Sequence, residues 1–219
     1  MRRTPIARFF NDFGSLYQYR DANAALGAPA PGERRVVFFG DSITALWNLD
    51  ASFPGVGCIK RGIGGQTTEQ MLLRFRPDVV DLRPALVLIL AGTNDIAGNT
   101  GPMTLEHTTG NLATMAELAE VHGIRIALGS VTPVHHASFA AMRHFVLRPQ
   151  KRILALNEWL RQYCAAHSLI YLDYFAAMAD QRGLLRRELA EDGLHPNAAG
   201  YALMTPIAQA AIDRVLSEH

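Results

Sequence analysis

The sequence predicts an α/β fold in which about five parallel strands form one sheet with helices on both faces, a three-layer α/β/α sandwich. Short apolar runs alternate with helical patterns along the whole chain, as expected of such a sandwich. The runs are continuously apolar, which is typical of strands that are buried on both faces. A chain of 219 residues with 49% hydrophobic residues is long enough for one domain of this kind.

The predicted strands are short runs of mainly aliphatic and aromatic residues. They fall at residues 36–39, 56–59, 85–90, 124–128 and 169–172. The run at 85–90 is the clearest, and the run at 56–59 is the weakest. Because glycine or polar residues separate these runs from the rest of the chain, we expect a separate strand at each.

Helical patterns lie between the apolar runs. Residues 105–121 place apolar side chains at the spacing of one helix face, and Gly123 is expected to end that helix. Further helices are predicted over 14–25, 67–75, 149–167 and 197–216. Pro206 lies inside the last of these, so we expect that helix to be kinked or split.

Residues 1–35 are predicted to form an N-terminal extension that packs on a single domain of residues 36–219. The extension ends in the proline-rich stretch 28–35. Its first residues carry positive charge without the apolar stretch of a secretory signal, and the longest apolar run, 85–91, is too short to cross a bilayer. We therefore expect a protein without membrane insertion that is cytoplasmic by default, or secreted or periplasmic if a signal peptide has been removed.

Charge and cysteine content argue against several classes of function. The formal net charge of +1 predicts neither a nucleic-acid-binding surface nor a polybasic membrane patch. The two cysteines, Cys58 and Cys164, do not make a disulfide framework or a zinc site, and we expect both to be buried free thiols. The sequence predicts no metal site and no cofactor, and it makes no prediction about the oligomeric state.

Polar and glycine-rich segments follow the predicted strands. Ser42 follows the first strand, Gly64 and Gly65 follow the second, and Asn94 follows the third. Asp192 and His195 stand three positions apart just before the last predicted helix. Because open parallel sheets bind ligands beyond the carboxyl ends of their strands, we expect these segments to meet at one edge of the sheet.

Each of these residues also has an ordinary structural explanation. Ser42 is suited to cap a helix, and the glycine pair and Asn94 are typical of tight turns. Asp192 would then cap its own turn, and His195 would merely pack. Taken together, they supply the parts of an acyl-transfer site: a nucleophile, a base, an acid that orients the base, and donors to an oxyanion. The Gly-x-Ser-x-Gly elbow of α/β-hydrolases is absent.

Four segments resemble sequence blocks of the SGNH, or GDSL, hydrolase superfamily. They are 40–44 (Gly-Asp-Ser-Ile-Thr), 62–65 (Gly-Ile-Gly-Gly), 92–95 (Gly-Thr-Asn-Asp) and 192–197 (Asp-Gly-Leu-His-Pro-Asn). The resemblance implies a flavodoxin-like fold. Within the superfamily the chain is most similar to bacterial lysophospholipase-like and platelet-activating-factor-acetylhydrolase-like esterases. It departs from those relatives at Gln66, where many have Asp, and near Lys60, where many have Asn.

The resemblance implies a catalytic triad. Ser42 would be the nucleophile, His195 the general base, and Asp192 the carboxylate that orients the base. Asp41 would brace the loop that carries the nucleophile.

The resemblance also implies an oxyanion hole with three donors. The backbone N–H of Ser42 would give the first donor, and the backbone N–H of Gly65 the second, with Gly64 the less favoured choice. The side-chain amide of Asn94 would give the third donor.

The sequence thus predicts a serine esterase that hydrolyses carboxylic esters through an acyl-enzyme, with short acyl groups of the acetyl type. Its partner would be a small-molecule ester, for example an acetylated carbohydrate. The alternative is a thioesterase, a lysophospholipase or an acyltransferase that uses the same triad. A non-catalytic protein that keeps the fold is disfavoured, because every member of the triad is present.

The candidate substrate-binding residues are Asp41, Trp47, Gly64, His135 and Phe139. Trp47 stands just past the expected nucleophile and either walls the acyl pocket or belongs to the core. His135 and Phe139 fall within residues 131–148, the longest insertion. This segment either lines or covers the pocket, or forms a surface helix.

Overall fold

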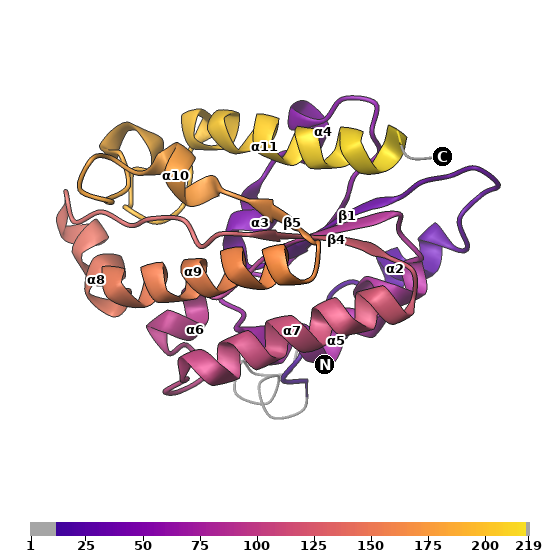
Figure 1. The fold of residues 1–219 in the computed structure, drawn as a ribbon, viewed down its shortest axis with the longest axis horizontal. Coiled ribbons are helices and arrows are strands. Elements are labelled where there is room, and N and C mark those ends of the chain that lie inside the picture. The colour runs from indigo at the N-terminus through magenta and orange to yellow at the C-terminus, as the bar shows by residue number, and fades with distance from the viewer. Residues whose placement is uncertain (1–11, 218–219) are drawn as a thin grey trace, which may run out of the picture.

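The computed structural model describes residues 12–217, and its centre is a five-stranded parallel sheet (Figure 1). The strands are β1 (Val36–Gly40), β2 (Ile59–Gly62), β3 (Leu86–Leu90), β4 (Arg125–Gly129) and β5 (Ile170–Leu172). Their order across the sheet is β2-β1-β3-β4-β5, and every neighbouring pair is parallel. The predicted α/β architecture is therefore confirmed.

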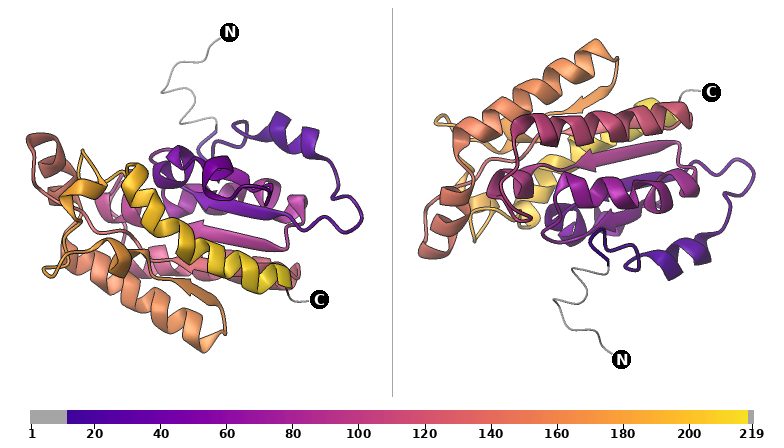
Figure 2. Two further views of the ribbon diagram at one scale, coloured as in Figure 1. Left: turned by 90° about the horizontal axis from the view of Figure 1, so that it is seen from above. Right: turned by 90° about the horizontal axis from the view of Figure 1, so that it is seen from below.

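Helices cover both faces of this sheet (Figures 1 and 2). One face carries α5 (Thr68–Asp78), α7 (Leu105–Val121) and α9 (Gln150–Ala166). The other face carries α3 (Ser42–Leu46), α4 (Leu49–Ser52), α10 (Tyr174–Met178) and α11 (Ala198–Ser217). The remaining helical segments are α2 (Arg20–Leu26), α6 (Thr93–Ala97), α8 (Phe139–Leu147), and the 3-10 turns η1 (Val80–Leu82) and η2 (Arg187–Leu189). None of the helices within residues 12–217 combines the length and apolarity required to cross a membrane.

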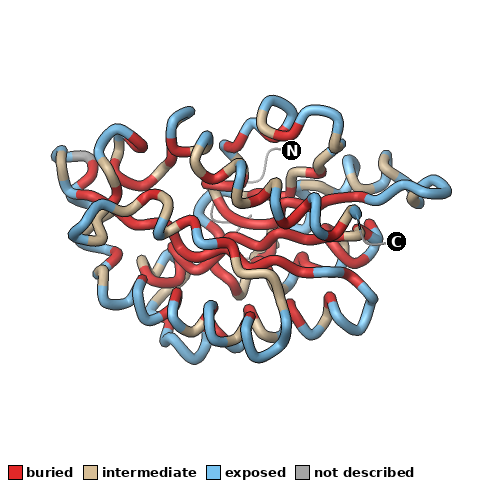
Figure 3. Tube along the Cα trace, turned by 45° about the horizontal axis from the view of Figure 1, so that its top comes forward, coloured by how far each residue is buried: buried red, intermediate tan, exposed pale blue. Residues whose placement is uncertain are grey.

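The strands are buried on both faces, as their continuously apolar sequences predict. On β1, Val37 and Phe39 pack under α5, α7 and α9, while Val36 and Phe38 pack under α3, α4, α10 and α11. Figure 3 shows the buried residues concentrated along the strands and the inward sides of the helices. Each fully buried side chain of this size contributes roughly 1.5–3 kcal/mol to the free energy of folding. The two layers of packing therefore hold the strands, and the residues at their ends, in place.

The second strand lies three residues later than predicted. The sequence predicted it at 56–59, and the structure places β2 at Ile59–Gly62. The hydropathy pattern did not reveal this strand, because the strand contains Lys60 and Arg61. Their charged ends bond to neighbouring backbone and side-chain oxygens. Cys58 consequently precedes the strand and is only half-buried, although both cysteines are free, as expected.

The last helix is continuous through its proline. Pro206 lies inside α11, which runs unbroken for 20 residues, so the predicted split does not occur. Pro206 cannot donate a backbone hydrogen bond to Ala202, but both residues are exposed, and water can satisfy the freed carbonyl. The buried face of the helix, which includes Met204 and Ala208, is therefore undisturbed.

Residues 12–35 pack on the rest of the chain through side-chain hydrogen bonds to backbone carbonyls. Residues 1–11 of the predicted extension lie outside the described residues. The Tyr19 hydroxyl donates to the carbonyl of Gly62, and the Asn23 amide donates to the carbonyl of Pro77. Gln66, a departure from the family pattern, is buried and donates to the carbonyl of Gly14, so its side chain holds this N-terminal segment.

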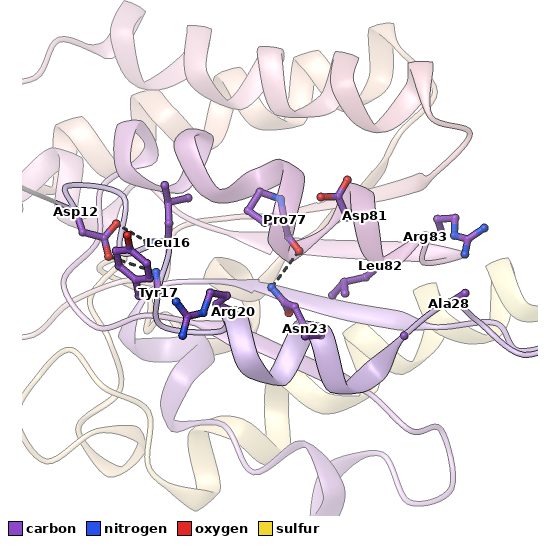
Figure 4. Close-up of a pocket in the computed structure, with 12 residues that line it drawn as sticks. Asp12, Leu16, Tyr17, Arg20, Asn23, Ala28, Pro77, Asp81, Leu82 and Arg83 are labelled. Atoms are coloured by element: carbon purple, nitrogen blue, oxygen red, sulfur yellow. Dashed lines mark hydrogen bonds between the residues drawn. The ribbon is translucent and has the colours of Figure 1, made fainter.

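A pocket of about 640 Å³ lies between this N-terminal segment and the approach to β3 (Figure 4). Tyr17 and Arg20 line it on one side, and Pro77, Leu82 and Arg83 line it on the other. Because Leu82 and Arg83 precede β3, the pocket opens near the amino ends of the strands. It is therefore separate from the carboxyl ends, where the sequence places the candidate catalytic residues.

Candidate active site

The loop after β1 presents Ser42 at the carboxyl edge of the sheet, as the first residue of α3. Gly40 permits this sharp return, because a Cβ atom there would stand 2.3 Å from Thr44 Oγ1 and 2.5 Å from the carbonyl oxygen of Leu90. Asp41 caps the helix, and its Oδ1 accepts from the backbone N–H of Ile43 at 2.9 Å. The N–H of Ser42 belongs to the first helical turn and has no acceptor within the helix.

Ser42, His195 and Asp192 form a continuous chain of hydrogen bonds. Ser42 Oγ lies 2.9 Å from His195 Nε2, across a separation of 153 residues in the sequence. His195 Nδ1 lies 2.6 Å from Asp192 Oδ2. The other carboxylate oxygen, Oδ1, accepts from the backbone N–H groups of Leu194 and His195 at 3.0 and 2.8 Å.

The environment of Asp192 determines which nitrogen of His195 carries the proton. Partial burial acts to raise the pKa of Asp192, but the bonds from the ring and backbone of His195 and from the Leu194 N–H outweigh it and lower the pKa to about 2. The carboxylate is then ionised at neutral pH and can only accept hydrogen bonds. Nδ1 of neutral His195 must therefore carry the proton, which leaves the lone pair of Nε2 directed at the hydroxyl of Ser42.

His135 holds the turn that presents Asp192 and His195. Its Nδ1 accepts from the N–H of Ala137 at 3.1 Å, and its Nε2 lies 2.8 Å from the carbonyl oxygen of Ala190. A Cβ atom on Gly193 would stand 2.7 Å from the carbonyl oxygen of His135. His135 is buried, and both its ring nitrogens are bonded to backbone. It is therefore placed to brace this turn rather than to present its ring to substrate, the role that the sequence predicted for it.

Asn94 lies buried at the start of α6, directly beyond β3. Its Nδ2 donates to the carbonyl oxygen of Gln66 at 3.0 Å, and its Oδ1 accepts from Arg148 Nη2 at 3.1 Å. Among the described residues, these are the partners of the amide, so one of its two N–H groups is available to a ligand. The neighbouring strands β1 and β3 bring this amide to the same edge of the sheet as Ser42.

The glycine pair lies next to Ser42. A Cβ atom on Gly64 would stand 3.8 Å from the Cβ of Ser42. Gly65 adopts a left-handed conformation with φ +78°, and its carbonyl accepts from Asn99 Nδ2 at 2.9 Å. Within residues 12–217, neither backbone N–H of the pair has an acceptor, and both glycines are exposed. This loop can therefore supply N–H donors beside the hydroxyl.

Asp41 is a buried carboxylate at the base of the site. Burial raises its pKa to about 6, against the bond from the Ile43 N–H and the electrostatic effects of His195 and Arg148. Its Oδ2 has no hydrogen-bond partner among the described residues, and neither has Thr132 Oγ1. Both residues line one small pocket. Asp41 is thus a helix cap behind Ser42, with 1% of its surface exposed.

Of the two predicted substrate-binding aromatics, one lies in the core and the other faces solvent. Trp47 is 1% exposed, stacks on Tyr201 and bonds to Ser52 Oγ, so it belongs to the core between α3, α4 and α11. Phe139 is 97% exposed at the start of α8. Its side chain faces solvent because the insertion forms a surface helix.

The insertion contributes two side chains to the site, His144 and Arg148, neither of which was among the predicted site residues. Arg148, the residue that ends α8, bonds to Asn94 and to Thr93 Oγ1. His144 Nε2 lies 3.9 Å from Asp192 Oδ2, and its ring packs edge-on against that of His195. No local pattern marks these residues, since both contacts join positions about 50 residues apart.

His144, Asp192 and His195 are the described residues that could hold a metal ion, with one ligand atom each within 4.8 Å of one another. In the structure, however, Asp192 Oδ2 and both ring nitrogens of His195 are already engaged in the chain that ends at Ser42. A cation bound by all three groups would therefore break that chain. The arrangement suits proton transfer from a hydroxyl better than metal coordination.

Comparison with known proteins identifies the family. The model of the GDSL-like Lipase/Acylhydrolase family matches residues 38–203, and the chain belongs to this family. Its fold and its sequence blocks thus define a hydrolase of the acylhydrolase class, which confirms the resemblance found in the sequence.

Solved structures and a curated relative share this likeness. A GDSL-like lipase from Bacteroides thetaiotaomicron VPI-5482 is 40% identical, with a TM-score of 0.84, over 92% of this chain and 98% of that one. A structure from Bacteroides fragilis NCTC 9343 is 39% identical, with a TM-score of 0.86, over 94% and 99% of the two chains. The lipoprotein YqeF of Bacillus subtilis (strain 168) is 33% identical over 127 residues, which are 49% of this chain and 52% of that protein. The match thus spans about half the length of this curated relative.

Proposed function

We propose that this protein is a serine esterase that hydrolyses carboxylic esters with short acyl groups. The observation that carries the proposal is the continuous chain from Ser42 Oγ through His195 to Asp192, with distances of 2.9 and 2.6 Å. Such a chain activates a hydroxyl that is otherwise a poor nucleophile. Ser42 and His195 are both partly exposed, so an ester can reach them.

The first half-reaction follows from the proton positions. His195 Nε2 accepts the hydroxyl proton as Ser42 Oγ attacks the ester carbonyl carbon, and Asp192 stabilises the imidazolium that forms. The imidazolium then gives the proton to the departing alcohol, which leaves an acyl-enzyme on Ser42. His195 then removes a proton from water, whose oxygen attacks the acyl carbon of the acyl-enzyme. The imidazolium returns this proton to Ser42 Oγ as the acid leaves, which restores the free enzyme.

The carbonyl oxygen becomes negatively charged in each tetrahedral intermediate and needs donors. The backbone N–H of Ser42, an N–H of the Gly64–Gly65 loop and the free N–H of the Asn94 amide are suited to this role. They are fixed before the reaction by the helix start, the turn and the buried amide. Loss of one such donor typically costs roughly 10²–10³ in rate.

The surroundings of the hydroxyl favour a small acyl group. Gly64 and His195 lie beside Ser42, and Gly65 and Asn94 stand at the same edge of the sheet. The aromatic side chains proposed for an acyl pocket, Trp47 and Phe139, lie in the core and in solvent. An acetyl ester, for example on a carbohydrate, fits such a site better than a long acyl chain.

The test is ester hydrolysis by the wild-type protein and by Ser42→Ala. We expect the wild-type protein to hydrolyse p-nitrophenyl acetate faster than longer p-nitrophenyl esters, and Ser42→Ala to abolish hydrolysis while thermal unfolding is unchanged. Ser217→Ala, which alters an exposed serine at the end of α11, is the matched control and should retain full activity. Full activity of Ser42→Ala would refute the proposal.

The substrate class is tested with the same preparation. Acetylated sugars and an acyl-CoA are run beside the p-nitrophenyl esters, with release of acid as the readout. Preferential release of acetate from the sugar esters supports the proposed class. Faster hydrolysis of the acyl-CoA, or transfer of the acyl group to an added alcohol in preference to water, would replace it with a thioesterase or an acyltransferase.

A further inference from the structure

Arg148 connects the end of α8 to the start of α6. Arg148 is 3% exposed, and its guanidinium bonds to residues 54 and 55 positions away in the sequence. Nε donates to Thr93 Oγ1 at 2.8 Å, and Nη2 donates to Asn94 Oδ1 at 3.1 Å. A planar guanidinium that is bonded at two points has a fixed orientation, so Arg148 holds this part of the site more firmly than a single bond would.

These bonds determine which way the Asn94 amide faces. Arginine has donors and no acceptor, so the atom of Asn94 that meets Arg148 must be the oxygen. The carbonyl of Gln66 can only accept, so the atom that meets it must be the nitrogen. A flipped amide would set N–H against guanidinium and oxygen against oxygen. Both partners therefore enforce one orientation, and in that orientation one amide N–H remains free.

The last turn of α8 also contacts the triad. Arg148 Nη1 lies 3.4 Å from His144 Nδ1, so that nitrogen accepts and the proton of neutral His144 is on Nε2. Nε2 faces Asp192 Oδ2 at 3.9 Å. Burial and the charge of Arg148 lower the pKa of His144, which favours this neutral form. The end of α8 thus contacts both the Asn94 amide, through Arg148, and the Asp192 carboxylate, through His144.

We propose that Arg148 is a positioning residue that fixes the Asn94 amide with its free N–H toward the carbonyl oxygen attacked by Ser42. The proposal rests on the proposed function, because the amide has a catalytic role only if an oxyanion forms beside it. Arg148 itself touches no substrate. Its buried positive charge also polarises the amide through Oδ1, which strengthens the N–H as a donor at the moment when negative charge appears.

A double-mutant cycle on kcat tests whether Arg148 acts through Asn94. Asn94→Ala should lose roughly 10²–10³-fold in kcat. Arg148→Met in the wild-type background should lose at least about tenfold in kcat, with KM within about twofold, because ground-state binding is untouched. Arg148→Met in the Asn94→Ala background should lose less than about threefold more, since the amide it positions is gone.

Two further variants separate positioning from folding. Arg152→Met is the matched control, because Arg152 also anchors a helix to this region, through the carbonyls of Ile96 and Met103, without touching Asn94. It should keep kcat within about twofold. Arg148→Lys keeps the charge and most of the volume but offers one donor atom for two acceptors. Thermal unfolding should show that this variant is folded. Like Arg148→Met, it should lose kcat in the wild-type background and lose much less in the Asn94→Ala background.

The outcomes distinguish this proposal from the proposed function. If the wild-type protein hydrolyses no ester, the proposed function fails. If the wild-type protein is active, equal losses from Arg148→Met or Arg148→Lys with and without Asn94 would overturn the positioning role alone. Unchanged kcat in either Arg148 variant would overturn it as well.

Discussion

The buried carboxylate of Asp41 gives a prediction about folding that does not depend on catalysis. Its Oδ1 caps α3, while Oδ2 is buried without a hydrogen-bond partner among the described residues. Asp41→Asn keeps an oxygen for the cap, since asparagine caps helices as well as aspartate does. It also replaces the unpartnered oxygen with an N–H donor that faces the same pocket as Thr132 Oγ1.

The magnitude follows from the pKa of Asp41, which burial raises from 3.8 to about 6. Between these two pH values the folded state binds a proton that the unfolded state has lost, so stability falls as the pH rises. A pKa difference of one between the folded and unfolded states corresponds to about 1.4 kcal/mol. Above about pH 6 the ionised carboxyl therefore lowers the free energy of unfolding by about 3 kcal/mol. Asp41→Asn removes this cost and should be more stable than the wild-type protein at pH 7.5, but not at pH 4.

The assay is urea unfolding of both proteins from pH 4 to pH 7.5. Asp173→Asn is the matched control, because Asp173 caps α10 in the same way but is exposed. It should change the free energy of unfolding by less than about 0.5 kcal/mol at every pH. The argument from burial would be refuted if Asp41→Asn raised the free energy of unfolding by an amount that does not grow with pH, or if it lowered the free energy of unfolding at pH 7.5.

Two further predictions concern the proposed triad and the core. Asp192→Asn should lower kcat about 10⁴-fold, because the amide no longer holds the proton on His195 Nδ1. Glu191→Gln, at the neighbouring position, is the control and should leave kcat unchanged. A loss of kcat below tenfold in Asp192→Asn would contradict the tautomer argument. Arg74→Met should lower the free energy of unfolding by about 3–5 kcal/mol in urea unfolding, because buried Asp78 loses its ion pair at 2.9 Å. Arg76→Met, on an exposed face of the same helix, should change it by less than about 0.5 kcal/mol, and equal effects of the two would contradict a buried pair.

Most of the fold was predictable because its signals are local. The helix predicted at 105–121 coincides with α7, since amphipathic spacing and a glycine stop suffice to define it. The strand at 56–59 was misplaced because β2 carries Lys60 and Arg61, and an edge strand can hold charged side chains that reach out of the sheet. Hydropathy alone does not reveal a strand that is defined by its backbone hydrogen bonds to the neighbouring strand, here β1.

The candidate site divides in the same way. The segments with Ser42, Asn94 and His195 were predicted to meet because parallel strands place their carboxyl ends at one edge. The roles proposed for Trp47, His135 and Phe139 depended instead on which way an insertion or a short helix faces. Burial decides that direction, and the sequence of an insertion without a clear hydrophobic period does not fix it.

The sequence by itself determined the parallel sandwich, the family and the residue types at the strand ends, because each is written in short stretches of chain. Only the tertiary structure decided that Arg148 faces Asn94, that His144 faces Asp192, and that Trp47 is core. These contacts join residues far apart in sequence, and close packing of the whole domain selects them. No short stretch of sequence contains the information about which distant surface it will meet.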